Sequence, residues 1–179
     1  ALENLYLLNR VAEHFGKKYP DVVFSMLAYL DFPAAPPSPP FKFEPNVGTG
    51  IAFLWRNFGR PVSACERSVG DHDNWQKLLD PRGKGGLYIW DYYANFASFI
   101  QPYPNLDTMG MNLRHYKRHG VTMVSAQMQF SNIGDLCDLH FWMLSELCWN
   151  PDADDRALVA KYLAAAYGKA ARLVQEYID

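Results

Sequence analysis

The chain has 179 residues, of which 49% are hydrophobic and 15% aromatic, so it can bury a core and we expect a single domain. Its 17 basic and 19 acidic residues are spread along the sequence and give a formal net charge of −2, without the basic stripe that a nucleic-acid partner would require. No run approaches the roughly 20 apolar residues of a membrane span.

The first quarter of the chain predicts a helix, a strand and a proline-rich loop. Apolar residues recur at helical spacing between positions 5 and 15, and basic residues followed by Tyr19-Pro20 end this helix. Residues 22–29 form a largely apolar run typical of a buried parallel strand. The loop 30–46 holds six of the chain's twelve prolines, so it is either a stiff loop or a linker between domains.

Strands and helices continue to alternate after this loop. Further strands are predicted at 47–55, from Gly86, and at 121–126, and helices around 74–79, 106–118, 135–149, 155–167 and up to about 178. The helix at 135–149 is apolar nearly all round, so we expect it to be buried.

This order predicts an α/β fold, because strands that alternate with helices pair in parallel. The βα units (1–149) and the C-terminal helices (150–179) amount to half of a (β/α)8 TIM barrel. A half barrel leaves two sheet edges open. We therefore expect the carboxyl-terminal half of a barrel whose first strands are missing from this sequence, or else self-association. Ligands collect at the carboxyl ends of such strands, where Tyr29, Trp55, Asp91 and Gln127 should converge.

The stretch 86–96, Gly-Leu-Tyr-Ile-Trp-Asp-Tyr-Tyr-Ala-Asn-Phe, carries the clearest chemical signal. It begins as a buried strand but ends with Trp90, Asp91, Tyr92 and Asn95, where a plain core strand would simply stop. Aromatic faces stack on the C–H faces of a sugar ring, and a few fixed polar groups hydrogen-bond its hydroxyls. We therefore expect an oligo- or polysaccharide as the partner.

Several blocks of the sequence resemble a known family. They are Tyr19-Pro-Asp, Leu87-Tyr-Ile-Trp-Asp-Tyr-Tyr-Ala-Asn-Phe, Pro102-Tyr-Pro-Asn-Leu and Trp149-Asn-Pro-Asp-Ala-Asp. These blocks resemble a bacterial domain-of-unknown-function family that is associated with polysaccharide use and related to β-hexosaminidase-like and α-glucuronidase-like glycoside hydrolases. The resemblance implies a (β/α)8 catalytic domain that hydrolyses glycosidic bonds when complete, in a secreted, periplasmic or cell-surface protein.

One departure from the family pattern favours a different function. Relatives often have Glu-Gln-Gly near the end of the last strand, and this chain has Ala126-Gln127-Met128 there. The alternative is therefore a carbohydrate-binding or scaffold barrel without catalysis.

Glycoside hydrolysis usually requires two carboxyl groups that flank the scissile bond. Asp91 is the first catalytic candidate and Glu66 the second. Side chains alternate along a strand, so Asp91 shares a side with Ile89 and enters the cleft only if the strand bulges or ends before it. Otherwise Asp91 is a structural carboxylate that caps a loop or pairs with an arginine. Glu66 has the competing interpretation of a surface pair with Arg67 or Arg56.

The remaining candidates would bind the saccharide. They are Trp90, Tyr92, Asn95, Tyr29, Trp55, Gln127 and Gln129. Trp90 and Tyr92 would form a platform for a sugar ring, or alternatively pack in the core. Glutamine amides beyond the last strand can hydrogen-bond sugar hydroxyls.

We predict no cofactor and no metal site. Cys65 and His72 supply at most half of a metal site, and the glycines near 48–51 and 83–86 lack the spacing of a phosphate loop. Cys137 and Cys148 lie in the apolar helix, where we expect buried thiols rather than a disulfide framework.

Overall fold

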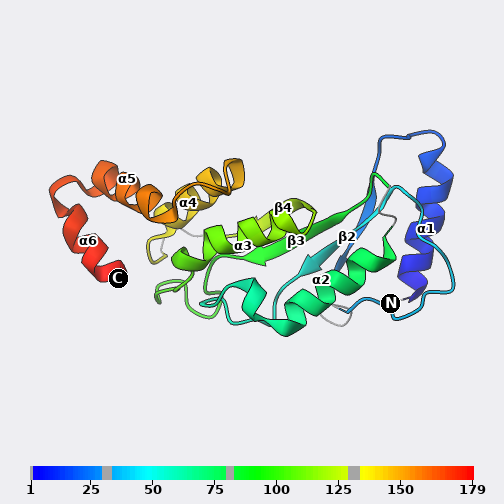
Figure 1. Ribbon diagram of the computed structural model, residues 1–179, viewed down its shortest axis with the longest axis horizontal. Coiled ribbons are helices and arrows are strands. Elements are labelled where there is room, and N and C mark those ends of the chain that lie inside the picture. The colour runs from blue at the N-terminus through cyan, green and yellow to red at the C-terminus, as the bar shows by residue number, and fades with distance from the viewer. Residues whose placement is uncertain (1, 30–33, 80–82, 129–133) are drawn as a thin grey trace.

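The computed structural model describes residues 2–29, 34–79, 83–128 and 134–179. Its centre is one sheet with the strand order β1 (Phe24–Ala28), β2 (Val47–Ala52), β3 (Leu87–Tyr92) and β4 (Val121–Gln127). All neighbouring strands pair in parallel. With its flanking helices and helical C-terminus, the molecule has the predicted α/β fold, in the arrangement expected of half a (β/α)8 barrel (Figure 1).

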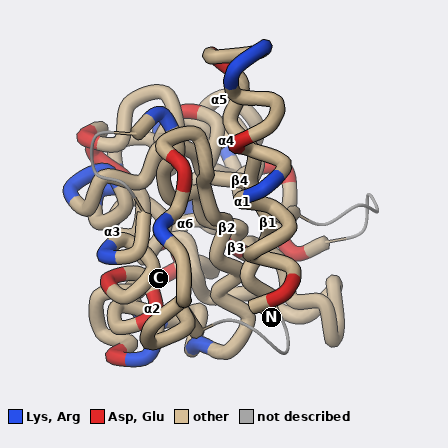
Figure 2. Tube along the Cα trace, turned by 90° about the vertical axis from the view of Figure 1, so that its right-hand side faces the viewer, with Lys and Arg blue, Asp and Glu red and all other residues tan. Residues whose placement is uncertain are grey.

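Three helices contact the sheet: α1 (Leu2–Gly16), α2 (Glu66–Leu78) and α3 (Leu106–Arg118). Figure 1 shows α2 and α3 in front of the strands, and in the turned view of Figure 2 both again lie on one side of them. A short 3-10 helix, η1 (Val62–Ala64), precedes α2. We call the side of the sheet that faces α2 and α3 the helix side.

Helix α2 begins earlier than the sequence predicts, at Glu66 rather than near position 74. Its first two turns bury Ser68 and His72 instead of apolar residues. Because the hydrophobic pattern starts only at Trp75, it predicts the second half of the helix and misses the first.

The hydrophobic core lies between the helix side of the sheet and the helices that cover it. Val47 and Ile51 of β2 and Leu87 and Ile89 of β3 are buried there. They pack with helix residues that include Trp75, Met109 and Leu113. These alternate strand positions explain why β2 and β3 form at the centre of a parallel sheet, where apolar, β-branched side chains are favoured.

The opposite side of the sheet, which we call the open side, carries large aromatic side chains next to glycines. Tyr88, Trp90 and Tyr92 project there from β3. Tyr88 is in register with Gly50 of β2, and Trp90 with Ala52. A Cβ atom at Gly50 would lie 2.0 Å from the Tyr88 ring, so only glycine allows this ring to lie across β2. On β4, Met123 of the open side is 53% exposed.

The C-terminal helices extend from the sheet beyond β4 (Figure 1). They are α4 (Cys137–Trp149), α5 (Asp155–Tyr167), the 3-10 turn η2 (Gly168–Ala170) and α6 (Ala171–Ile178). Asp155, at the start of α5, forms an ion pair of 2.9 Å with Arg114 of α3. Gly110 leaves the room for it, because a Cβ there would lie 2.1 Å from an Asp155 carboxylate oxygen.

Helix α4 corrects the prediction of a buried helix. One face packs in the core through Leu139, Met143 and Leu147, but Phe141 and Trp149 are exposed. Cys148 is also exposed and Cys137 is half-buried, so neither is a fully buried thiol. The sequence of α4 has apolar residues on every face, and such a pattern does not indicate which face packs against the rest of the protein.

The described part of the proline-rich loop, 34–46, packs along α1. The Asn9 side chain donates a hydrogen bond to the Lys42 carbonyl and accepts one from the Glu44 N–H, at 3.0 and 2.7 Å. Phe43 between them is buried. In the described parts of the chain, no helix is long and apolar enough to cross a membrane.

Candidate functional site

Four of the predicted saccharide-binding residues meet at the carboxyl ends of the strands on the open side. Trp90 and Tyr92 come from β3, Gln127 from the end of β4, and Tyr29 follows β1 directly. The Trp90 indole Nε1–H donates a hydrogen bond of 2.7 Å to the Gln127 Oε1 atom. Tyr92 lies beside Tyr29, and burial, strengthened by this neighbouring hydroxyl, raises the pKa of the Tyr92 hydroxyl. We call these four residues the strand-end wall.

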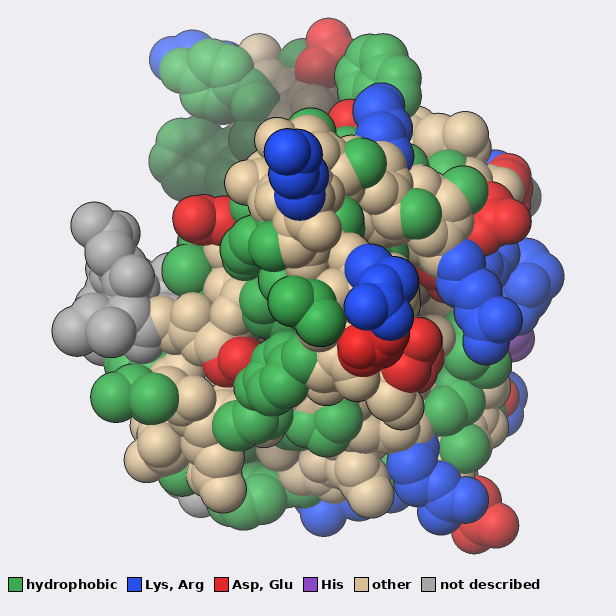
Figure 3. Space-filling view, turned by 90° about the vertical axis from the view of Figure 1, so that its left-hand side faces the viewer, with side chains coloured by type: hydrophobic (Ala, Val, Ile, Leu, Met, Phe, Trp, Pro, Cys, Tyr) green, Lys and Arg blue, Asp and Glu red, His purple; other side chains and the backbone are tan. Residues whose placement is uncertain are grey.

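The strand-end wall offers what a sugar ring requires. The Tyr29 hydroxyl and the Gln127 amide can exchange hydrogen bonds, and the half-buried Trp90 ring supplies an apolar face. Tyr92 is only 6% exposed, so most of its ring packs in the core, as the alternative interpretation has it. Trp90 and Gln127 hold each other in place before any ligand arrives, which lowers the entropy that binding would have to remove. Figure 3 looks onto the end of the molecule toward which the strands run, where the C-terminal helices also lie, and shows hydrophobic side chains gathered among charged ones.

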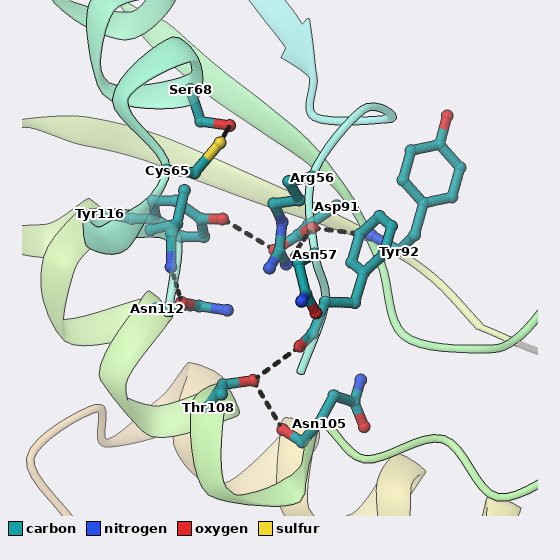
Figure 4. A network of polar contacts seen from close by, with 12 residues as sticks. Arg56, Asn57, Cys65, Ser68, Asp91, Tyr92, Asn105, Thr108, Asn112 and Tyr116 are labelled. Atoms are coloured by element: carbon teal, nitrogen blue, oxygen red, sulfur yellow. Dashed lines mark hydrogen bonds and ion pairs between the residues drawn. The ribbon is translucent and has the colours of Figure 1, made fainter. Parts of the chain in front are cut away.

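Asp91 lies on the helix side, turned away from this wall. Its side chain is 0% exposed, and its carboxylate receives hydrogen bonds from Arg56 Nη2 at 2.8 and 3.0 Å. The Tyr116 hydroxyl donates a further bond of 2.7 Å and the Tyr92 backbone N–H one of 2.9 Å. Figure 4 shows the carboxylate enclosed by these donors while the Tyr92 ring points away from them.

Strand parity explains this placement. Strand β3 stays extended from Ile89 to Tyr92, and its one register shift lies earlier, between Leu87 and Tyr88. Without a bulge before it, Asp91 shares the helix side with Ile89. The geometry favours the alternative of a structural carboxylate paired with an arginine, and a catalytic role for Asp91 stays a prediction.

The surroundings of the ion pair are apolar and aromatic. The Arg56 side chain is only 2% exposed, and its guanidinium lies 4.3 Å from the centre of the Phe58 ring. Burial is the largest single influence and lowers the pKa of Arg56. The charge and hydrogen bonds of Asp91, together with the neighbouring Tyr116 and Tyr93 hydroxyls, outweigh burial and raise this pKa. Burial, strengthened by the same carboxylate, raises the pKa values of the Tyr93 and Tyr116 hydroxyls, so both stay neutral.

The other predicted site residues lie apart from Asp91. Trp55 is 61% exposed, three residues beyond the end of β2. Asn95 is half-buried and its side chain accepts a hydrogen bond from the Ala97 N–H, as in a turn. Glu66 is exposed at the first position of α2, and among the described residues it has no ion pair with Arg67 or Arg56. Gln129 lies outside the described residues.

A small cavity lies behind the wall, between the segment after β3 and the start of α4. Its volume of about 20 Å³ is enough for one water molecule. Tyr93 and His140 line it, and the Tyr93 hydroxyl and His140 Nε2 are buried without a hydrogen-bond partner in the described structure. Burial lowers the pKa of His140, which keeps the imidazole neutral.

Cys65 and His72, the metal-ligand candidates of the sequence, have other contacts. Within the described ranges, no group of three or more His, Cys, Asp or Glu residues is arranged to hold a metal ion. Cys65 instead accepts a hydrogen bond from the Ser68 hydroxyl, and His72 Nδ1 lies 3.1 Å from an Asp73 carboxylate oxygen.

The sequence interpretation missed the residues that hold the segment between β2 and η1 to α3. The Thr108 hydroxyl donates to the Phe58 carbonyl at 3.2 Å, and Asn112 Oδ1 accepts from the Val62 N–H at 2.7 Å (Figure 4). Both are polar residues buried within a helix. Their polarity at positions on the apolar face of α3 was the signal, because a buried polar group needs a partner.

Comparisons with known proteins identify the family alone. No curated protein and no solved structure matches the chain significantly. The model of a family described as a domain of unknown function, DUF4838, matches residues 2–179. The chain therefore belongs to the DUF4838 family.

Proposed function

We propose that this chain binds a saccharide at the carboxyl ends of its strands and that, within a complete barrel, it takes part in hydrolysing glycosidic bonds. The strand-end wall is the observation that carries the proposal. Three strands contribute to it, and its hydrogen-bonding groups stand beside aromatic faces, which is the combination that sugar sites use. The resemblance of the sequence to a family related to glycoside hydrolases supports the same function.

A non-catalytic carbohydrate-binding or scaffold barrel is the second candidate, and one observation favours it. Asp91 is sealed behind β3 by four hydrogen bonds, and Glu66 is exposed on α2. Neither carboxyl group lies on the open side, whereas hydrolysis usually needs two carboxyl groups that flank the bond. This candidate predicts saccharide binding without turnover.

Calorimetric titration of the full-length protein with neutral, amino-sugar and uronic-acid oligosaccharides tests the binding. Trp90→Ala should weaken binding at least about tenfold, because it removes both the stacking face and the partner of Gln127. Trp149→Ala is the matched control. Trp149 is 92% exposed but lies at the far end of α4, next to the turn at Asn150, so its removal should leave affinity unchanged.

Equal affinity of wild type and the Trp90→Ala variant would rule out the strand-end wall as the saccharide site. For any oligosaccharide that binds, chromatography of the reaction mixture then separates the two candidates. Shorter products indicate a glycoside hydrolase, and an unchanged ligand indicates a binding barrel.

A further inference from the structure

The segment 53–61, which carries Trp55 from the end of β2 to η1, is held mainly from its helix side. The Phe53 N–H donates to the Trp90 carbonyl at 3.3 Å, which extends the pairing of β2 with β3 by one residue. Beyond Phe53 the strand ends, and side chains rather than backbone hydrogen bonds to β3 hold the segment in place. We call residues 53–61 the Trp55 loop.

Arg56 is the deepest anchor of the Trp55 loop. Its side chain passes from the loop to the carboxylate of Asp91, and Nη1 turns back to the Arg60 carbonyl at 3.4 Å. The Phe58 carbonyl and the Val62 N–H are bound farther along by α3. Trp55 itself is exposed, so its position depends on the neighbouring residues of the loop, such as Arg56, that are held by the rest of the fold.

A line of contacts links the same anchor to the strand-end wall. The Arg56 guanidinium stacks on the Phe58 ring, and the Phe58 ring meets the Tyr92 ring edge-on, with 6.1 Å between centroids. Asp91 and Tyr92 are adjacent on β3 and point to opposite sides of the sheet. Arg56 is therefore enclosed between the Asp91 carboxylate and an aromatic ring that touches the wall.

We infer that Asp91 and Arg56 are positioning residues, which hold the Trp55 loop and the Tyr92 ring in the geometry that receives a saccharide. Asp91 does not touch the ligand and acts through Arg56. This role rests on the proposed function for its ligand, while the hold on the loop can be measured without one.

Trypsin measures the hold on the loop directly. It cuts after lysine and arginine but not before proline, so Arg60, which precedes Pro61, resists it. The bond after Arg56 becomes a substrate only when this buried side chain leaves Asp91. Cleavage there gives one fragment that ends at Arg56 and one that begins at Asn57, and mass spectrometry identifies both.

Asp91→Asn should raise the rate of cleavage after Arg56 at least about tenfold under native conditions, because a neutral amide holds the guanidinium less tightly. Tyr116→Phe is the matched control. It removes another hydrogen bond to the same carboxylate and leaves the Arg56 contact intact, so it should change this rate by less than about threefold. An unchanged rate in Asp91→Asn overturns the inference. An equal rise of cleavage after Lys77 in α2 also overturns it, because general destabilisation opens the whole fold, whereas a released loop speeds cleavage after Arg56 alone.

If Asp91→Asn does not fold, the double variant Arg56→Gln with Asp91→Asn replaces it, because no unpaired charge is then buried. Amide hydrogen exchange of residues 53–60 is its readout. Faster exchange there, with unchanged exchange in α3, supports the inference. Unchanged exchange of 53–60 overturns it.

Saccharide titration completes the test. Variants that release the Trp55 loop should lose as much saccharide affinity as Trp55→Ala. A variant with a released loop and full affinity would refute the role of Asp91 and Arg56 in positioning Trp55 for the saccharide. If wild type binds none of the oligosaccharides, the proposed function fails, while the cleavage result still decides whether Asp91 and Arg56 hold the loop.

Discussion

Removing one partner of the Arg56–Asp91 pair should destabilise the protein far more than removing both. The two side chains are 2% and 0% exposed, so the carboxylate is out of reach of bulk solvent that could replace a lost partner. We consider three variants: Asp91→Asn, Arg56→Met and the double variant.

The expected magnitudes follow from desolvation. A buried charge left without its partner costs about 3–5 kcal/mol, and replacement of a whole buried pair by neutral groups is often close to neutral. Asp91→Asn keeps an oxygen acceptor for Arg56 and for the Tyr92 N–H, so we expect the lower end, about 3 kcal/mol. Arg56→Met leaves the carboxylate with Tyr116 and one backbone donor, and we expect about 4 kcal/mol.

Urea unfolding at pH 7, followed by far-UV circular dichroism, measures these changes. Domains of this kind have only about 5–15 kcal/mol of stability, so each single variant should shift the midpoint visibly, and the double variant should be more stable than either. Strictly additive losses would refute the reasoning. A loss below about 1 kcal/mol in Asp91→Asn would also refute the reasoning. It would favour a catalytic role for Asp91, because polar groups of active sites often lower the stability of the protein that carries them.

Three further predictions concern the helices. Gly70→Ala in α2 should stabilise by about 0.5–1 kcal/mol, because a Cβ there meets nothing within 4 Å and alanine is the better helix former. Gly110→Ala in α3 should instead destabilise by about 1 kcal/mol in the same urea assay, since its Cβ displaces Asp155, and an equal gain in both variants would contradict this steric argument. The pKa of His115 is lowered to about 4 by burial and by the neighbouring His119, His72 and Arg118, so below pH 6.5 the unfolded chain binds the proton more strongly. Its contribution to stability is complete above pH 6.5 and should fall by about 2–3 kcal/mol toward pH 4.5. The His115→Gln variant, unfolded in urea at both pH values, should lose less stability than wild type by this amount, while the loss due to His140 remains.

Several features of this protein were determined by the sequence alone. The alternation of apolar strands with amphipathic helices predicts the parallel α/β sheet, because periodicity is a local property of the chain. Strand parity likewise placed Trp90 and Tyr92 on one side of β3 and Asp91 on the other. The aromatic and amide character of the strand ends was also readable from residue types.

Other features were decided only by the tertiary structure. Arg56 reaches a carboxylate 35 residues away and Tyr116 reaches it from a third element, and no local pattern encodes which strand ends lie side by side. The first turns of α2 and the exposed face of α4 were mispredicted for a related reason, since burial of Ser68 and exposure of Phe141 depend on what packs there. Hydrophobic periodicity predicts which side chains avoid water. Strand register and helix packing determine which residues from distant parts of the chain come into contact.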